Sequence, residues 1–272
     1  MERKFSKVSI ITECEIALDK AVEKAEETVR RIKKNKNSRQ YIENFSYIRN
    51  NIIDWLPDKE GKTVLELNAG YGALTEYLTM HFEMVTVLEE TEEQAFINIS
   101  RNRDKENLTV CIGTPEEMLT KEIKEQFDHI IALELKGDME QQKAMLKLLY
   151  SRLKPEGTII YAAHNKYGLQ CWAEGGKRNE AAMTRQDAQK ILSDSGFNDV
   201  QFYYPYPGVK YATDIFSDEY LPKVGELTFN TLRLEDGENA IFDEFEMMNE
   251  IVKDGKFCEF VNEYLIIAKK EK

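Results

Sequence analysis

The sequence predicts an α/β protein in which strands and helices alternate along the chain. Three observations predict this class. Short apolar runs typical of buried strands recur from residue 63 onward. Segments with apolar side chains at helical spacing separate most of them. A small-residue turn, Asn68-Ala69-Gly70-Tyr71-Gly72, joins the first run to a helix, as at the opening of a βαβ unit. Alternation of this kind is typical of a sheet covered by helices.

The sequence pattern of the first sixty residues predicts a helical extension that is separate from the sheet. Residues 13–31 and 41–56 have apolar side chains at helical spacing, and a basic polar break at 33–39 lies between them. A turn at 57–62 then leads into the first strand. We therefore expect an extension over residues 1–60 and one domain over residues 61–272.

The sequence from residue 61 onward predicts seven strands. The predicted strands are 63–67, 85–89, 108–112, 127–133, 158–163, 200–204 and 264–268. The helices that follow the pattern are one beginning at Leu74, then 92–102, 141–153, 184–195 and 240–252. Residues 205–239 are aromatic and turn-rich without periodicity, which predicts an insertion outside the sheet.

Composition excludes several classes of partner. A net charge of -12 argues against a nucleic-acid backbone or an anionic membrane as the main partner. The four cysteines and three histidines show no spacing typical of a metal site, so we expect reduced thiols and no metal. The chain has no apolar stretch long enough to span a bilayer, which predicts a cytoplasmic location.

The turn at residues 68–72 predicts a ligand site. Gly70 and Gly72 allow positive φ and let a ligand lie against the backbone. The helix that follows presents free N–H groups and the positive end of its dipole. By itself, such a turn fits a nicotinamide dinucleotide, a flavin or another adenosine cofactor.

Three features favour an adenosine cofactor without a pyrophosphate. The third glycine of the dinucleotide pattern is missing, because Thr75 stands there. Glu66 precedes the turn and favours a ligand with an amine. The second strand ends in Glu89-Glu90, where a carboxylate is placed to accept both hydroxyls of a ribose. A nicotinamide oxidoreductase is therefore disfavoured, and the turn Gly113–Glu116 lies where adenine edges are usually read.

Five segments resemble the motif series of class I S-adenosylmethionine-dependent methyltransferases. They read ELNAGYG, VTVLEE, CIGTPEEM, FDHIIAL and LKPEGTIIYA, and the resemblance covers about 63–204 with the last strand. It implies a doubly wound, mostly parallel seven-stranded sheet of Rossmann-like form and S-adenosyl-L-methionine as cofactor. The family's motif is an acid followed by three alternating glycines. Glu66, Gly70 and Gly72 match it, and Asn68 replaces the first glycine. Asparagine is the non-glycine residue that best tolerates positive φ.

The resemblance implies a set of cofactor-binding residues. Glu66 is expected near the methionine amine, Glu89 at the ribose with Glu90 beside it, and Leu133 next to the methionine moiety. The remaining members are the turn residues Asn68, Ala69, Gly70 and Gly72, and the adenine neighbours Thr114, Pro115 and Glu116.

A narrower resemblance lies in residues 164–175, 202–222 and 254–270. These segments are similar to a bacterial group of the same enzymes that occurs beside, or fused to, glycosyltransferases for surface polysaccharides. The group implies a hydroxyl of a sugar or glycan precursor as acceptor and a glycosyltransferase as partner. After Gly175 the chain lacks the group's longer stretch with an acid and a histidine. The alternative is therefore a weak or inactive cofactor-binding module beside a glycosyltransferase.

A hydroxyl acceptor must lose a proton, so the site needs a base. His164, at the end of the fifth strand, titrates in the right range, and Glu134, after the fourth strand, competes with it. Trp172, Tyr204 and Tyr206 are candidates for stacking on a sugar ring; the alternative is a cover packed over the sheet edge. The oligomeric state is not predicted.

Overall fold

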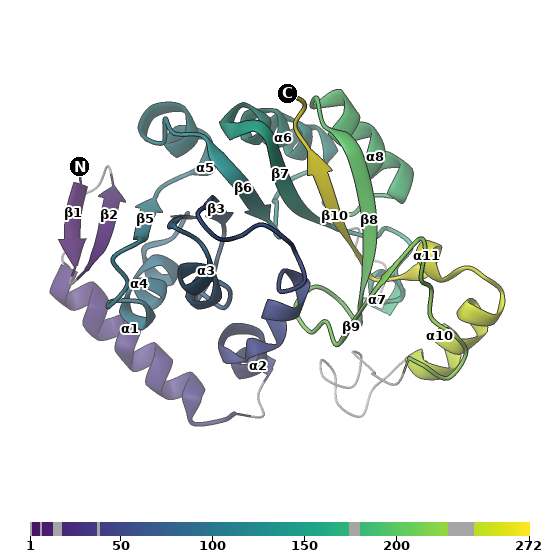
Figure 1. Ribbon diagram of the computed structural model, residues 1–272. Helices are drawn as coiled ribbons and strands as arrows, with labels where there is room; N and C mark the ends of the chain where they lie inside the picture. Colours follow the sequence, from purple (N-terminus) through teal and green to yellow (C-terminus); the bar gives the residue numbers. More distant parts are fainter. Residues whose placement is uncertain (1, 6, 13–17, 37–38, 174–179, 228–241) are drawn as a thin grey trace.

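The computed structural model describes residues 2–5, 7–12, 18–36, 39–173, 180–227 and 242–272. Within these ranges the strands form one ten-stranded sheet in the order β1-β2-β5-β4-β3-β6-β7-β10-β8-β9 (Figure 1). Their bounds are β1 Glu2–Phe5, β2 Val8–Thr12, β3 Thr63–Leu67, β4 Met84–Glu89, β5 Leu108–Ile112, β6 Phe127–Ala132, β7 Leu153–His164, β8 Asn198–Tyr206, β9 Asp214–Ser217 and β10 Glu263–Lys269.

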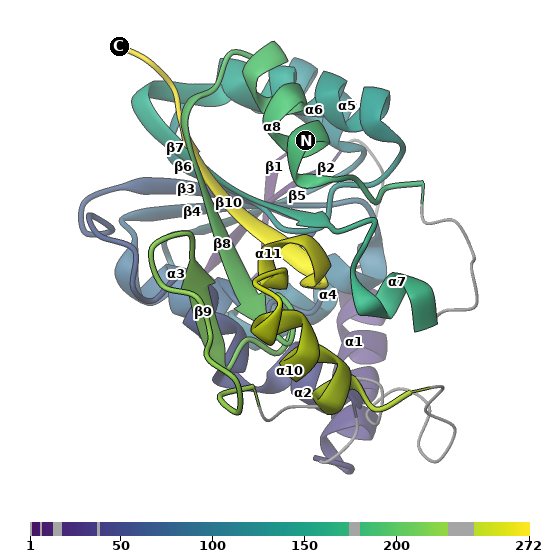
Figure 2. The ribbon, with the colours of Figure 1, turned by 90° about the vertical axis from the view of Figure 1, so that its right-hand side faces the viewer.

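Helices cover both faces of the sheet (Figure 2). α1, α3 and α4 pack their apolar side chains on one face, and α6 and α8 do so on the other, which gives two cores. The helical segments are α1 Leu18–Lys33, α2 Arg39–Phe45, the 3₁₀ helix η1 Tyr47–Ile52, α3 Thr75–His81, α4 Glu92–Arg101, α5 Pro115–Glu117, the π-helical turn η2 Met118–Glu122, α6 Met139–Arg152, α7 Leu169–Ala173, α8 Arg185–Asp194, α10 Glu244–Lys253 and α11 Phe257–Phe260. None of the described helices is long and apolar enough to cross a membrane.

Seven central strands have the predicted doubly wound arrangement. β3, β4, β5, β6 and β7 pair in parallel, and β10 lies antiparallel between β7 and β8. Because the chain order reverses at β3, the carboxyl ends of β3, β4 and β6 meet at a topological switch point, where open α/β sheets bind ligands.

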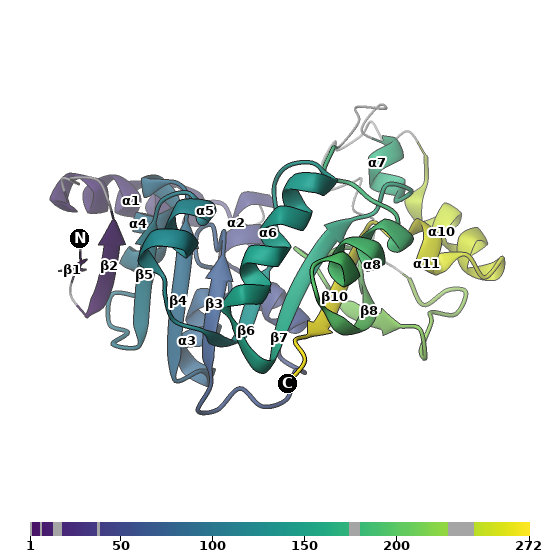
Figure 3. The ribbon, with the colours of Figure 1, turned by 90° about the horizontal axis from the view of Figure 1, so that it is seen from above.

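The predicted helices of residues 1–60 are present as α1, α2 and η1, but the expectation that this segment is separate from the sheet is wrong. β2 pairs in parallel with β5, and β1 pairs with β2 at the sheet edge (Figure 3). Val8, Ile10 and Thr12 are buried, and Ser9 and Ile11 between them are half-buried. This alternation is the signature of a strand, but it extends over only five residues, which is short beside the helical spacing that follows.

The helix predicted over 41–56 is divided at Ser46. α2 ends at Phe45, and the Ser46 hydroxyl donates to the carbonyl of Ile42 at 2.6 Å, within the last turn of α2. The chain then continues as η1. Because a 3₁₀ helix has three residues per turn, Arg49 and Ile52 share one face, and both are buried.

The predicted insertion at 205–239 begins as part of the sheet. β8 continues through Tyr206, and β9 pairs with it antiparallel, so these residues form a hairpin at the far edge from β1. Residues 228–239 lie outside the described residues. The helix predicted from residue 240 is α10, which begins at Glu244 after the Asp243 cap.

Candidate cofactor and acceptor site

A pocket of about 480 Å³ lies at the carboxyl ends of β3, β6 and β7. Segments far apart in the sequence build it: the N-terminal helices, the turn after β3, the loop after β6 and the loop after β8. The lining residues are Glu43, Asn44, Arg49, Asn68, Gly70, Gln94, Glu134, Leu135, Lys136, Gly137, His164, Ala181 and Lys210.

The turn after β3 has the conformation that its sequence predicts. Asn68, Gly70 and Gly72 have φ of 51°, 63° and 73°. The Asn68 side chain donates to the backbone oxygen of Glu134 at 3.0 Å, which joins the turn to the loop after β6. A Cβ at Gly72 would lie 2.4 Å from Oδ1 of Asn98, so a side chain here would have to displace that buried amide. Ala69 is buried within the turn.

Glu66 is buried at 3% exposure and hydrogen-bonded. The Thr75 hydroxyl donates to its Oε2 at 2.7 Å, and Asn98 in α4 donates to Thr75 at 2.9 Å. Burial raises the pKa of Glu66 to about 7, although Thr75 and the charges of Arg49 and Arg101 oppose this. Thr75, which stands where a dinucleotide fold has its third glycine, therefore holds the carboxylate.

Glu89 ends β4 and is fully buried. No side chain among the described residues donates to either of its carboxylate oxygens, and the backbone amide of Gly70 lies close enough only to lower its pKa. Burial, with the nearby charge of Glu66, raises the pKa of Glu89 to about 9. Buried acceptors without donors are costly, which indicates a ligand that supplies hydroxyl groups here. The side chain is covered and does not line the pocket.

The other expected cofactor residues are spread more widely. Thr114 caps α5 by accepting from the Glu117 amide, and it lies with Pro115 and Glu116 at the surface, away from the pocket lining. Leu133 is buried in the core on the α3–α4 face. Glu90 pairs with Lys136 at 2.7 Å, beside the pocket.

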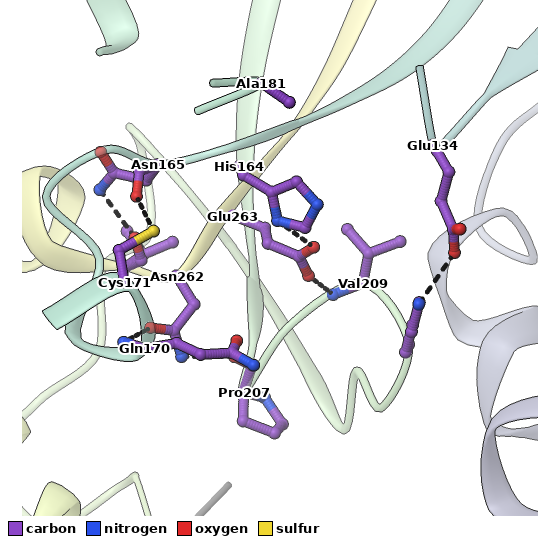
Figure 4. A network of polar contacts seen from close by, with 12 residues as sticks. Glu134, His164, Asn165, Gln170, Cys171, Ala181, Pro207, Val209, Asn262 and Glu263 are labelled. Atoms are coloured by element: carbon purple, nitrogen blue, oxygen red, sulfur yellow. Dashed lines mark hydrogen bonds and ion pairs between the residues drawn. The ribbon is translucent and has the colours of Figure 1, made fainter. Parts of the chain in front are cut away.

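Both candidate bases line the pocket (Figure 4). His164 Nδ1 lies 3.1 Å from Oε1 of Glu263, and 46% of the His164 side chain is exposed. Glu134 Oε1 lies 3.1 Å from Nζ of Lys210 and 3.9 Å from Arg49. Both cations occupy the same carboxylate oxygen of Glu134, whereas one ring nitrogen of His164 is left for a substrate, so His164 is the better placed base.

Sequence reasoning missed Arg49 and Glu263. Arg49 is 8% exposed, lines the pocket and has an Nε without a partner in the described part of the chain. The signal available in the sequence was a lone arginine three residues before Ile52 in an apolar segment. Glu263 begins the last strand, next to the strand that ends in His164.

The N-terminal segment is fastened to both sides of the pocket. Arg101 in α4 donates to the backbone oxygen of Asn44 at 2.6 Å and also to that of Tyr71 in the glycine turn. Asn51 donates to the backbone oxygen of Ala212 at 2.9 Å, in the loop after β8. Residues 43–51 therefore form one wall of the site.

The expectation that Tyr204 and Tyr206 stack on a sugar is wrong. They are 0% and 2% exposed and belong to the core of the α6–α8 face. The Tyr204 ring packs edge-on against Phe257, so no ring face is open to a ligand. Trp172 is 63% exposed but does not line the pocket, and its role stays a prediction. The shortened stretch 174–177 lies outside the described residues.

Comparison with known families gives a match over the centre of the chain. The family model of nodulation protein S (NodS) matches residues 43–191. A ubiquinone biosynthesis O-methyltransferase of Coxiella burnetii is 28% identical over 109 residues, which are 39% of this chain and 45% of that protein. The corresponding protein of Pseudomonas putida is 24% identical over 119 residues, 44% of this chain and 51% of that protein. The match thus spans about half the length of these relatives.

Solved structures share the fold. The N-methyltransferase NodS of Bradyrhizobium japonicum superposes with a TM-score of 0.53 at 13% identity, covering 82% of this chain and 94% of that one. Its complex with S-adenosyl-L-homocysteine gives a TM-score of 0.55 at 12% identity, over 92% and 100%. An S-adenosylmethionine-dependent methyltransferase of Archaeoglobus fulgidus gives 0.53 at 17% identity, over 82% and 93%.

We predict that Gly72→Ala costs more stability than Gly61→Ala. Both glycines have similar φ, 73° and 69°, so both variants carry the same backbone strain of about 1–2 kcal/mol. Only the Cβ at position 72 meets Asn98, whereas the Cβ at position 61 meets nothing within 4 Å. Urea denaturation measures the difference. Equal losses in the two variants would contradict the close approach of Asn98.

Proposed function

Since the chain belongs to the NodS family and has the class I S-adenosylmethionine-dependent methyltransferase fold, we propose that it transfers a methyl group from S-adenosyl-L-methionine to a hydroxyl of a sugar or glycan precursor. The family model covers just over half of the chain, residues 43–191. The observation that carries the cofactor half of the proposal is Glu89, fully buried with no side-chain donor to either oxygen among the described residues, at the strand end beside the positive-φ turn. Two adjacent ribose hydroxyls supply the donors that this carboxylate lacks.

Opposite charges near the turn suit the amino-acid end of the cofactor. The buried acid Glu66 lies below the turn, and the buried cation Arg49 lines the pocket beside it. We assign the methionine amine to the side of Glu66 and the methionine carboxylate to Arg49, whose Nε is unpartnered within the described ranges. A guanidinium is the preferred partner of a carboxylate because it offers donors in a fixed planar fork.

Methyl transfer from a sulfonium is an in-line displacement, so the protein chiefly aligns the donor and the nucleophile. When the nucleophile is a hydroxyl, its proton must also leave, and we assign that proton to His164. The sugar as acceptor rests on the resemblance of residues 164–175, 202–222 and 254–270 to the glycosyltransferase-associated group. Among the expected aromatic contacts, only Trp172 stays available for a sugar.

A second reading is a weak or inactive module beside a glycosyltransferase. Its first support was Asn68, but the structure gives this residue the φ of the glycine that it replaces, together with a hydrogen bond to the loop after β6. Its second support, the stretch after Gly175, lies outside the described residues. We therefore keep the active enzyme as the proposal, with a glycosyltransferase as proposed partner.

Calorimetry with S-adenosylhomocysteine tests the cofactor site. We expect the wild type to bind and Glu89→Ala to bind about tenfold more weakly, because two hydrogen bonds to the ribose are lost and each contributes about 0.5–1.5 kcal/mol. Glu83→Ala is the matched control, since Glu83 is exposed and precedes the other end of β4. No binding by the wild type would remove the cofactor assignment, and unchanged affinity of Glu89→Ala would remove the ribose role.

The assignment of Arg49 has a separate test with two ligands. 5′-Methylthioadenosine has the ribose and adenine of the cofactor but lacks the amino-acid end. We expect Arg49→Gln to weaken binding of S-adenosylhomocysteine about tenfold and to leave binding of methylthioadenosine unchanged. Glu89→Ala should weaken both ligands. If Arg49→Gln weakens both ligands equally, Arg49 acts on the fold of the pocket and not on the carboxylate.

The acceptor is tested by transfer of a labelled methyl group. We expect label from S-adenosyl-L-methionine to enter a sugar-containing extract as a methyl ether, identified by mass spectrometry, and His164→Ala to reduce transfer about 100-fold or more. Label found as an N-methyl group would place an amine in the acceptor position. Absence of transfer in extracts that contain glycan precursors would favour the binding module.

A further inference from the structure

Glu263 lies directly opposite His164 in the antiparallel pairing of β10 with β7. Side chains of opposite residues in such a pair point to the same side of the sheet and touch. The contact is a hydrogen bond of 3.1 Å between Nδ1 of His164 and Oε1 of Glu263 (Figure 4). One ring nitrogen of His164 is therefore occupied by a residue 99 positions later in the chain.

The second oxygen of Glu263 is also occupied. The Val209 amide donates to Oε2 at 2.6 Å, so the carboxylate is held between β7 and the loop after β8. Burial raises the pKa of Glu263, but the hydrogen bonds from His164 and Val209 and the charge of Lys210 outweigh it and hold the pKa below its ordinary value. Glu263 is therefore ionised at neutral pH.

The loops around this carboxylate leave it little freedom. A Cβ at Gly208 would lie 2.8 Å from Oε2 of Glu263, so glycine is what lets the loop pass the carboxylate this closely. Asn262 donates to the backbone oxygen of Pro207 at 3.1 Å and accepts from the Gln170 amide at 2.9 Å. Asn165, next to His164, donates to the backbone oxygen of Val261 at 2.7 Å. Buried amide side chains thus fix the start of β10 against both neighbouring segments.

An ionised carboxylate has no proton to donate, so the proton of the His164–Glu263 hydrogen bond belongs to Nδ1 of the histidine. This holds whether the ring is neutral or charged. The nitrogen that gains and loses a proton is then Nε2, which in Figure 4 points away from Glu263. The ring lines the pocket, so Nε2 is the nitrogen available to a substrate.

We propose, on the basis of the proposed function, that Glu263 is the positioning residue that holds His164 in the Nδ1–H form with Nε2 as proton acceptor for a hydroxyl nucleophile. As the acceptor oxygen attacks, the new O–CH₃ bond forms and the S–CH₃ bond breaks. The electron pair of that bond stays on sulfur, and the hydroxyl proton moves to Nε2. Glu263 stays ionised and stabilises the imidazolium that results.

This arrangement favours oxygen over nitrogen as the acceptor atom. A hydroxyl keeps its proton at neutral pH and becomes acidic only as its oxygen is methylated, so it gains from a base in the transition state. A neutral amine attacks with a free electron pair and needs no base during the displacement. A buried carboxylate that makes a neighbouring histidine more basic is therefore of most use to a hydroxyl.

Three charged side chains from different segments act on His164. The hydrogen bond to Glu263 is the largest influence and raises the pKa of His164, and the charge of Glu134 raises it further. Burial and the charge of Lys210 lower it. Lys210 itself pairs with Glu134 at 3.1 Å, so these two charges partly cancel at the histidine.

Nuclear magnetic resonance of histidine-labelled protein tests the proposal directly. The chain has three histidines, His81, His129 and His164, and His164→Gln assigns the signals. We expect the ¹⁵N shifts of the wild type to show the Nδ1–H form of His164 and a pKa above 6.5. In Glu263→Gln the pKa should fall by about 1 or more, because an opposite charge within hydrogen-bond distance is removed. Glu134→Gln is the matched control, and it should change the pKa less and leave the tautomer unchanged.

An Nε2–H tautomer in the wild type would overturn the proposal, and this result needs no variant to fold. A pKa of His164 that is equal in Glu263→Gln and the wild type would overturn it as well. Binding of S-adenosylhomocysteine, measured on the same samples, should be unchanged in Glu263→Gln. If the wild type does not bind S-adenosylhomocysteine, the proposed function is wrong. The tautomer and pKa of His164 still decide whether Glu263 positions the histidine.

Discussion

The parallel hydrogen bonding of β3 to β4 on one side and to β6 on the other sets the positions of the three acids around the glycine turn. It places Glu66 one residue before the end of β3, Glu89 at the end of β4 and Glu134 just beyond β6, all at one edge of the sheet. The apolar strand interiors on both sides make this register strict, because a slip by one residue would turn buried side chains toward the wrong face. Two of these acids lie in a dry environment, and their raised pKa values follow from that burial.

The two buried acids, Glu66 and Glu89, differ in how their oxygen atoms are hydrogen-bonded. Glu66 accepts a hydrogen bond from Thr75, to which Asn98 donates in turn, whereas Glu89 has no side-chain donor in the described residues. An acid with internal donors is stable without a ligand, but an acid without them is stabilised when a ligand provides them. Glu66 is therefore held in place before the cofactor binds, whereas Glu89 depends more strongly on the bound group.

Local patterns predicted the parts of this molecule that depend on neighbours in sequence. The turn at 68–72, the central strands and the helix predicted over 184–195 all follow from spacing and residue type, and the structure confirms them. The missed features depend on contacts between distant segments. β2 is recognisable as sheet only once β5 is beside it, and Glu263 matters only because β10 lies next to β7. Aromatic residues such as Tyr204 were ambiguous because the same ring serves a core or a sugar site.

The wall formed by residues 43–51 bears on how this protein can be divided. β2 adds to the edge of the sheet beyond β5, α1 runs back along α4, and η1 brings Arg49 into the pocket, so the N-terminal sixty residues begin at the sheet and end at the site. A chimera that joined residues 61–272 to another N-terminal segment would keep the glycine turn. It would lose Arg49 and the helix α1 that packs on α4. The smallest part of the chain that keeps the whole pocket therefore includes the N-terminal segment. The residues that line the pocket, and not the start of β3, determine where such a part begins.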